Sequence, residues 1–149
     1  MKKLITLLFL SLFISSHANA ADGLISVESK HSVKETADKF ASIVEQKGLT
    51  LFARIDHQKN AAGVDLTLRE TEVILFGSPK VGTPLMQCAQ TMAIDLPQKV
   101  LVWKDADNKV WLSYNDPEYL KKRHSIEGCD PVIKKVSNVL SALTGAAAK

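Results

Sequence analysis

The sequence is poor in the signals that mark several large classes of protein. After the N-terminal segment, none of its apolar runs approaches the roughly 20 residues that a membrane span requires. Its 19 basic residues are nearly balanced by 16 acidic ones and are not clustered, so the kind of surface that attracts nucleic acid is missing. No internal repeat or low-complexity linker is present either. We therefore expect one domain that does not bind nucleic acid.

Catalytic motifs are missing as well. No serine occurs in a G-x-S-x-G context and no H-E-x-x-H pair is present, so a hydrolase is not supported. Lys80 lies between Gly77 and Gly82, but the Gly-Lys-Ser/Thr ending of a phosphate-binding loop is absent, which excludes that kind of nucleotide site. The sequence therefore identifies no catalytic residue.

Cysteine is rare, with only Cys88 and Cys129 in the whole chain. Neither has a second cysteine at C-x-x-C spacing, which argues against a thioredoxin-like redox site and a zinc knuckle. The N-terminal segment, which has the pattern of a signal peptide, predicts export to an oxidising compartment. Because the number of cysteines is also even, we predict an intrachain disulfide between these two residues. The bond would tie the central helix to the segment before the last helix.

The N-terminal segment has the pattern of a secretory signal peptide. Two lysines precede the apolar run 4–14, and small residues in an A-x-A pattern end at Ala20. This run is about half as long as a membrane span, so we expect cleavage after Ala20 rather than anchoring. Residues 1–20 are predicted to be a signal peptide and residues 21–149 a single α+β domain, periplasmic or secreted and without a membrane span.

Hydrophobic periodicity predicts the elements of that domain. One amphipathic helix is expected between the capping box of Ser32 with Glu35 and a stop at Gly48. Another follows the cap-and-proline start at Asp130, and shorter helices are expected after Thr83 and at Pro117. Five strands are expected, at residues 24–28, 49–57, 72–76, 99–103 and 110–114. Residues 58–68 are expected to form a loop or one short helical turn.

The order β-α-β-β-α-β-β-α predicts an α+β two-layer sandwich, with one largely antiparallel sheet and helices on one face. The other face must be solvated or covered by a partner. If Trp103 and Trp111 point to that face, a homodimer would cover them. The alternative is that both point toward the helices, because strand register is not set by the sequence alone.

The segment 73–86 is the candidate ligand site. Its apolar residues 73–76 are followed by two glycines and two prolines, which end the strand. Ser78 and Thr83 each precede a proline, so a tight turn and a helix start are expected by Thr83. The unpaired backbone N–H groups of a helix start suit a ligand.

Several spaced motifs resemble a known family. The chain carries F-G-S-P-K-V-G-T-P-L-M at 76–86, I-D-L-P-Q-K-V-L-V-W at 94–103, Y-N-D-P at 114–117 and R-H at 123–124. These motifs, with I-D-H at 55–57 and the alanine pair at 61–62, resemble the family called domain of unknown function 302 over nearly the whole predicted mature chain. That family more often has asparagine where this chain has Ser78, and the cysteines resemble an addition typical of exported members. The resemblance implies an α+β domain and supplies no activity, cofactor or catalytic residue.

Two histidines are candidates to join the turn. His57 ends a predicted strand and His124 follows Arg123 at a helix end. Each also has a structural interpretation, with His124 capping helix carbonyls and His57 bonding a loop carbonyl. The candidate ligand-binding set consists of His57, Gly77, Ser78, Gly82, Thr83, Tyr114, Asn115 and His124.

Copper is the one metal with a candidate ligand set. Met86 with His57 and His124 would supply nitrogen and sulfur ligands that suit copper. The spacing matches no closed metal motif, and a methionine at a helical position is typical of a core, so no metal or other cofactor is predicted.

Three classes of function are left. The leading one is an exported, non-enzymatic domain that binds a small molecule or a protein. The second is a periplasmic redox or copper-handling protein. The third is an uncharacterised enzyme that uses His124 and Tyr114 as acid and base.

Overall fold

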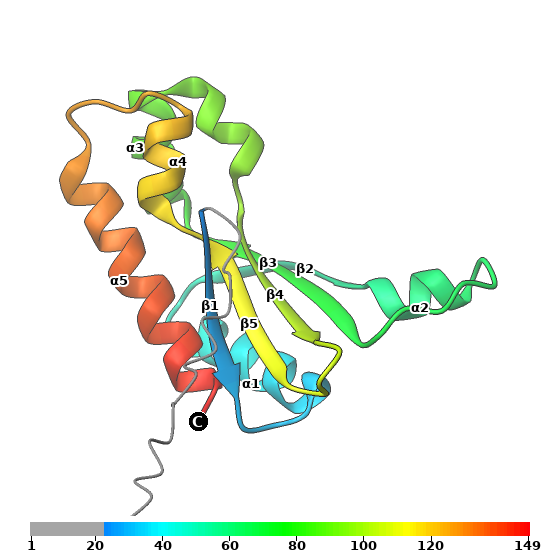
Figure 1. The fold of residues 1–149 in the computed structure, drawn as a ribbon. Helices are drawn as coiled ribbons and strands as arrows, with labels where there is room; N and C mark the ends of the chain where they lie inside the picture. The colour runs from blue at the N-terminus through cyan, green and yellow to red at the C-terminus, as the bar shows by residue number, and fades with distance from the viewer. Residues whose placement is uncertain (1–22) are drawn as a thin grey trace, which may run out of the picture.

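A single antiparallel sheet with helices packed on it forms the body of the protein (Figure 1). The structure is a computed structural model and describes residues 23–149. The predicted signal peptide and its cleavage site after Ala20 lie outside the described residues. Among the helices of residues 23–149, none is long and apolar enough to cross a membrane.

The described chain contains five strands and six helical segments. The strands are β1 (Leu24–Ser29), β2 (Thr50–Asp56), β3 (Thr71–Gly77), β4 (Gln98–Lys104) and β5 (Val110–Asn115). The helices are α1 (Val33–Gln46), α2 (His57–Ala62), α3 (Pro79–Cys88), the 3-10 helix η1 (Gln90–Asp95), α4 (Pro117–Arg123) and α5 (Asp130–Ala147). The strand order is β1-β5-β4-β3-β2, and every neighbouring pair is antiparallel. The predicted α+β fold is therefore confirmed.

Local signals explain where the helices start and stop. The capping box of α1 forms as predicted, with Ser32 and Glu35 each bonding the other's backbone N–H. Gly48 follows α1 with a φ of +68°, a conformation that favours glycine and ends the helix. Helix α3 begins at Pro79, directly after Ser78, so Pro84 lies inside it and leaves one backbone hydrogen bond unmade.

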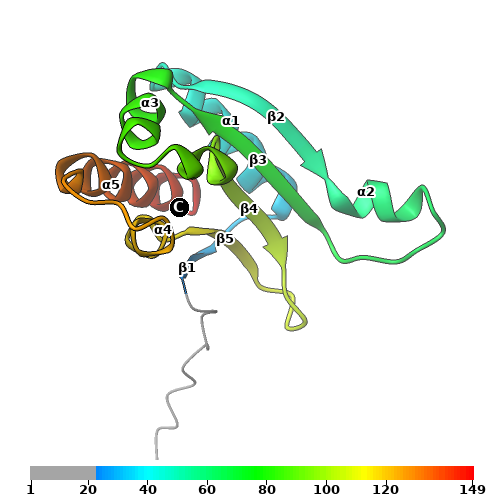
Figure 2. The same cartoon turned by 90° about the horizontal axis from the view of Figure 1, so that it is seen from above.

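The core lies between the sheet and helices α1 and α5 (Figure 2). Alternate residues of the central strands point into it, including Ile74 and Phe76 of β3 and Val100 and Val102 of β4, all fully or almost fully buried. The Phe76 ring meets the ring of Phe40 from α1 edge to face, with 5.1 Å between centroids. One face of the sheet is thus sealed by helices.

The other sheet face carries the two tryptophans. Trp103 pairs with Trp111 across β4 and β5, and the neighbouring pair of Val102 with Leu112 is buried under the helices. Because side chains alternate along a strand, both tryptophans point away from the helices. The indole N–H of Trp103 donates to Ser113 Oγ at 2.9 Å, and that of Trp111 donates to Asp105 Oδ2 at 2.8 Å. Of the two orientations that the sequence allowed, the outward one is present.

Candidate functional site

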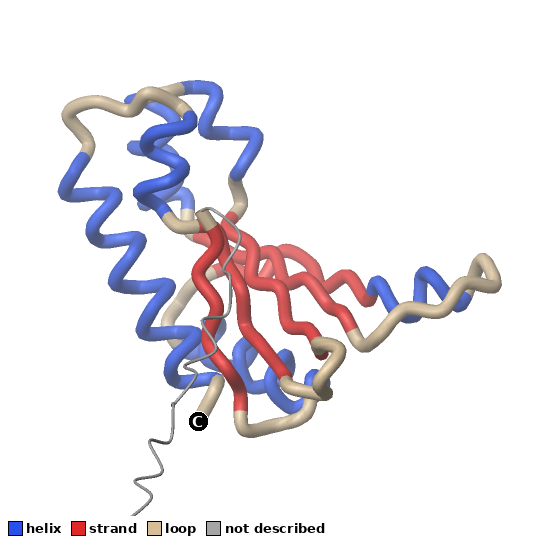
Figure 3. Tube along the Cα trace, viewed as in Figure 1, coloured by secondary structure: helices blue, strands red, loops and turns tan. Residues whose placement is uncertain are grey.

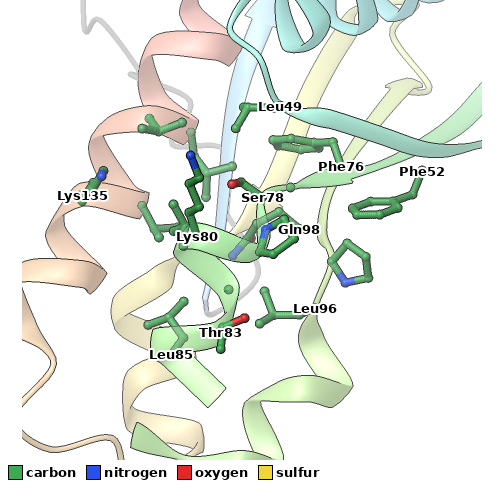
Figure 4. A pocket seen from close by; sticks show the side chains of 18 of the residues that line it. Leu49, Phe52, Phe76, Ser78, Lys80, Thr83, Leu85, Leu96, Gln98 and Lys135 are labelled. Carbon is green, nitrogen blue, oxygen red and sulfur yellow. The ribbon is translucent and has the colours of Figure 1, made fainter. Parts of the chain in front are cut away.

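A cavity of about 570 Å³ lies where α3 packs beside α5 and the ends of β2, β3 and β4 (Figure 4). Helix α3 contributes most of one wall, with residues 79–83, Leu85 and Met86. Val136, Val139 and Leu140 of α5 contribute another. The cavity therefore forms around the glycine- and proline-rich segment that the sequence marked as the candidate site.

The lining is mainly apolar. Phe76 and Leu49 border one part of the cavity, and Leu85 and Leu96 border the other (Figure 4). Val139 of α5 is 37% exposed although it belongs to the apolar stripe of its helix. An apolar side chain left open beside a cavity is available to a ligand.

Three lysines supply the charge at the cavity. Lys47 precedes β2, Lys80 belongs to α3 and Lys135 to α5, and no aspartate or glutamate lines the cavity with them. Within residues 23–149, none of the three forms a salt bridge. The Lys80 amino group points toward the end of the cavity where Leu49 lies (Figure 4). The site is positively charged and has no carboxylate of its own.

Four of the predicted ligand residues line this cavity: Gly77, Ser78, Gly82 and Thr83. Neither Gly77 nor Gly82 has a positive φ, so neither position requires glycine for its backbone conformation. A Cβ at Gly82 would lie 3.6 Å from Leu96 Cδ1, an ordinary contact. Gly82 therefore contributes empty space rather than a special conformation.

His57 lies away from the cavity, which corrects the expectation that it joins the turn. Thr50 at the start of β2 pairs with Gly77, whereas Asp56 at the end of β2 pairs with Glu72. His57 follows Asp56 as the first residue of α2, so a strand length of about 20 Å separates it from Gly77. The antiparallel pairing of β2 with β3 is the physical reason.

His124 is held by other side chains. It follows α4, its Nε2 lies 2.6 Å from Asp95 Oδ2, and its Nδ1 lies 3.1 Å from Thr91 Oγ1. Its side chain is only 6% exposed. Both ring nitrogens are therefore used to tie α4 to η1, and His124 does not line the cavity.

Tyr114 and Asn115 also lie outside the cavity lining. Tyr114 is 4% exposed on the helix side of β5, where burial raises the pKa of its phenol and a hydrogen bond with Thr144 opposes that shift. Asn115 ends β5 opposite Leu24. Since Tyr114 is buried on the helix side of β5, His124 is bonded to Asp95, and neither lines the cavity, the expected acid and base pair is not assembled there.

The copper set is not assembled either. Met86 lines the cavity, but His57 and His124 are held at the places just described. Among residues 23–149, no group of three or more His, Cys, Asp or Glu side chains is placed to hold a metal ion. The separation of His57 from the turn by the length of β2 is again the reason.

The predicted disulfide is confirmed. Cys88, the last residue of α3, bonds Cys129, which directly precedes α5, and their Cα atoms are 6.6 Å apart. The bond links α3 to the start of α5, and both helices contribute side chains to the cavity lining. It is therefore part of what positions that lining.

Sequence reasoning missed Lys47, Lys135 and the wall from α5, and it considered Lys80 only as part of a nucleotide site that it rejected. Lys135 and Val139 are four residues apart and so lie on one side of the helix, which was the available signal. Nothing local indicated that this side would meet α3. That contact depends on how the helices pack on the sheet.

The proteins that this chain resembles include longer relatives and a solved structure. The fluoride-specific ion channel FluC 1 of Brucella suis biovar 1 is 46% identical over 104 residues, which are 70% of this chain and 41% of that protein. FluC 1 of Brucella abortus and FluC 2 of Brucella melitensis show the same identity over the same length, 38% of each protein. The chain thus spans about two fifths of these curated relatives.

The solved structure supports the fold. The crystal structure of an uncharacterised conserved protein DUF302 from Bacillus stearothermophilus matches with a TM-score of 0.77 at 12% identity, over 85% of this chain and 99% of that one. The likeness at this identity concerns the fold alone. A family model described as domain of unknown function DUF302 matches residues 25–143, and the chain belongs to this family.

Proposed function

We propose that this protein is an exported, non-enzymatic binding domain whose cavity holds a small molecule with an apolar body and an anionic end. The observation that carries the proposal is the apolar cavity of about 570 Å³ with three lysines and no carboxylate in its lining. Cavities of this size are typical of small-molecule sites. An anionic group would give the lysines the partners that they lack within residues 23–149.

Binding rather than catalysis is supported by where the acid and base candidates are used. The cavity lining contains no histidine, aspartate or glutamate. His124 is bonded to Asp95, and Tyr114 is buried on the helix side of β5. A general acid or base must reach the group that it protonates or deprotonates, and neither residue lines the cavity.

Export is supported by two independent features. The N-terminal pattern is that of a signal peptide, and the Cys88–Cys129 disulfide is typical of an oxidising compartment. We therefore place the protein in the periplasm or outside the cell.

The name of the Brucella relatives suggests fluoride as a ligand, but the cavity argues for a larger one. A small anion needs several hydrogen-bond donors around it when it leaves water. The lining here is mainly apolar, with leucine, valine and phenylalanine side chains. The ligand class proposed here is therefore an amphipathic anion, such as a fatty acid.

The test compares decanoate with decanol, which have the same chain length, by calorimetric titration of the purified disulfide-bonded protein. We expect decanoate to bind more tightly than decanol. Replacing Lys135 with Gln should weaken decanoate binding by up to about fivefold and leave decanol unchanged, because an exposed ion pair contributes at most about 1 kcal/mol. Lys134→Gln is the matched control, since Lys134 is exposed on the same helix and does not line the cavity.

A second variant tests the cavity itself. Gly82→Leu should fill the space beside Leu96 and weaken both compounds at least about tenfold. Gly145→Leu is its control, since a Cβ at Gly145 meets no atom within 4 Å and Gly145 does not line the cavity. Equal binding of decanoate and decanol would overturn the anionic part of the proposal. Unchanged binding in Gly82→Leu would overturn the site.

A further inference from the structure

The outward sheet face carries several large apolar side chains, with the polar residues Thr71, Lys99 and Ser113 among them, and no helix covers it. We call it the open face and define it by six side chains that point away from the helices: Ile55, Val73, Leu75, Leu101, Trp103 and Trp111. They lie side by side on the four strands β2 to β5. None of the six residues is fully buried. A group of large apolar side chains on one uncovered face is typical of an interaction surface.

A second apolar surface projects from the edge of the sheet. Residues 57–70, which we call the arm, consist of α2 and the loop that follows it (Figure 3). Both views show the arm extending away from the rest of the molecule (Figure 1, Figure 2). Three of its apolar side chains are open to solvent, with exposed fractions of 66% for Val64, 66% for Leu66 and 42% for Leu68.

The exposed apolar residues of the protein are concentrated around this arm. Of the eight large exposed hydrophobic residues in the described chain, four lie between residues 55 and 68. Leu66 and Leu68 alternate with polar residues, as in a strand that has one apolar side. Because the arm extends away from its own sheet, its apolar side chains are available to another molecule.

The open face by itself is smaller than a stable protein–protein interface, which indicates that the arm and the open face belong to one interface. Its four strands, spaced about 4.8 Å apart and about 20 Å long, present a face of about 400 Å². A stable interface buries about 800 Å² on each partner. The open face alone falls short of that value, and the arm supplies further apolar area next to it.

We propose that the protein forms a symmetric homodimer in which the arm of each chain covers the open face of the other. In this arrangement a twofold axis relates the two chains, and each arm packs on the open face of the other chain. Both apolar surfaces of both chains are then covered, and no further copy can be added. The occupant of the open face is thus a second copy of this chain. The inference is independent of any ligand in the cavity, because no open-face or arm residue lines that cavity.

The first test measures mass and tryptophan emission of the purified, disulfide-bonded protein. Light scattering at micromolar concentration should give twice the chain mass. Trp103 and Trp111 are the only tryptophans in the sequence and both belong to the open face, so their emission should shift to longer wavelength when dilution separates the chains. A monomeric mass at 100 µM would overturn the proposal.

A charged side chain in the arm tests whether the arm belongs to the dimer interface. Leu66→Glu should raise the dimer dissociation constant at least about tenfold, because a carboxylate would be buried in an apolar contact. Ile94→Glu is the matched control, since Ile94 is 73% exposed and belongs to neither the arm nor the open face. Far-UV circular dichroism of both variants checks the fold. A dimer that Leu66→Glu and Ile94→Glu weaken equally would overturn the assigned interface.

Photo-crosslinking shows where the arm lies. With a photoreactive side chain at position 66, in a mixture of isotope-labelled and unlabelled protein, crosslinks should join different chains and end on peptides from β3, β4 or β5. Crosslinks confined to one chain, or ending on α5, would contradict the proposal.

Discussion

The Nε2 atom of His124 lies 2.6 Å from Oδ2 of Asp95, and this contact joins the end of α4 to the end of η1. Arg123 adds a weaker contact to the same carboxylate at 3.7 Å. The R-H motif, which the sequence suggested as part of a ligand site, therefore holds two short helices together. The region around the cavity depends on such ties, because α3, η1 and α4 all lie beyond the strand ends.

His124→Gln should lower thermal stability and leave decanoate binding unchanged. Glutamine keeps a hydrogen-bonding group but does not hold Asp95 and Thr91 at once, and loss of one buried hydrogen bond costs about 1 to 3 kcal/mol. Thermal unfolding followed by circular dichroism should show a Tm lower by several degrees. His57→Gln, at the exposed start of α2, is the control and should leave Tm unchanged. Lost decanoate binding at an unchanged Tm would instead assign His124 to the site.

Reduction of the Cys88–Cys129 bond should destabilise the fold and weaken ligand binding together. The two cysteines are 41 positions apart, and in the chain-entropy model closing a loop of that length stabilises the folded state by about 4 kcal/mol as an upper value. Urea unfolding of the oxidised protein and of a Cys88→Ala, Cys129→Ala variant measures the difference. Decanoate affinity should fall in the variant, because α3 and α5 are no longer tied. Equal urea midpoints would show that the bond does not constrain the fold.

Acid should remove a stabilising contribution from Asp105. The Trp111 indole N–H donates to this carboxylate, which holds its pKa below the ordinary value of 3.8, and backbone N–H groups of Lys109 and Asp107 act in the same direction. The folded state therefore releases this proton more readily than the unfolded state. The contribution of ionised Asp105 to the free energy of unfolding is therefore present above about pH 4. It is lost as the pH falls through the lowered pKa of the folded state.

The Asp105 prediction is checked by urea unfolding of the native protein and of Asp105→Asn between pH 6 and pH 2.5. The difference in unfolding free energy between the two proteins should shrink as the pH falls below about 4. Asp107→Asn is the control, because the Asp107 side chain forms no hydrogen bond within the described residues. A difference that stays constant over this pH range would contradict the assignment.

Local sequence signals determined most of the secondary structure. The capping box of Ser32 with Glu35 sets the start of α1, and the short apolar runs of β4 and β5 indicate strands. These signals depend on neighbours within a few residues, which is why they can be recognised without a structure. The cysteine pairing was also determined, since two cysteines in an oxidising compartment allow one bond only.

Tertiary structure alone decided which residues meet. The antiparallel pairing of β2 with β3 carried His57 to the far end of the sheet, and the register of β4 with β5 turned Trp103 and Trp111 outward. Lys47, Lys80 and Lys135 come from three distant segments and meet at one cavity because α3 and α5 pack beside the strand ends. Pairing register and helix packing depend on contacts across the whole chain, and local periodicity carries no information about them.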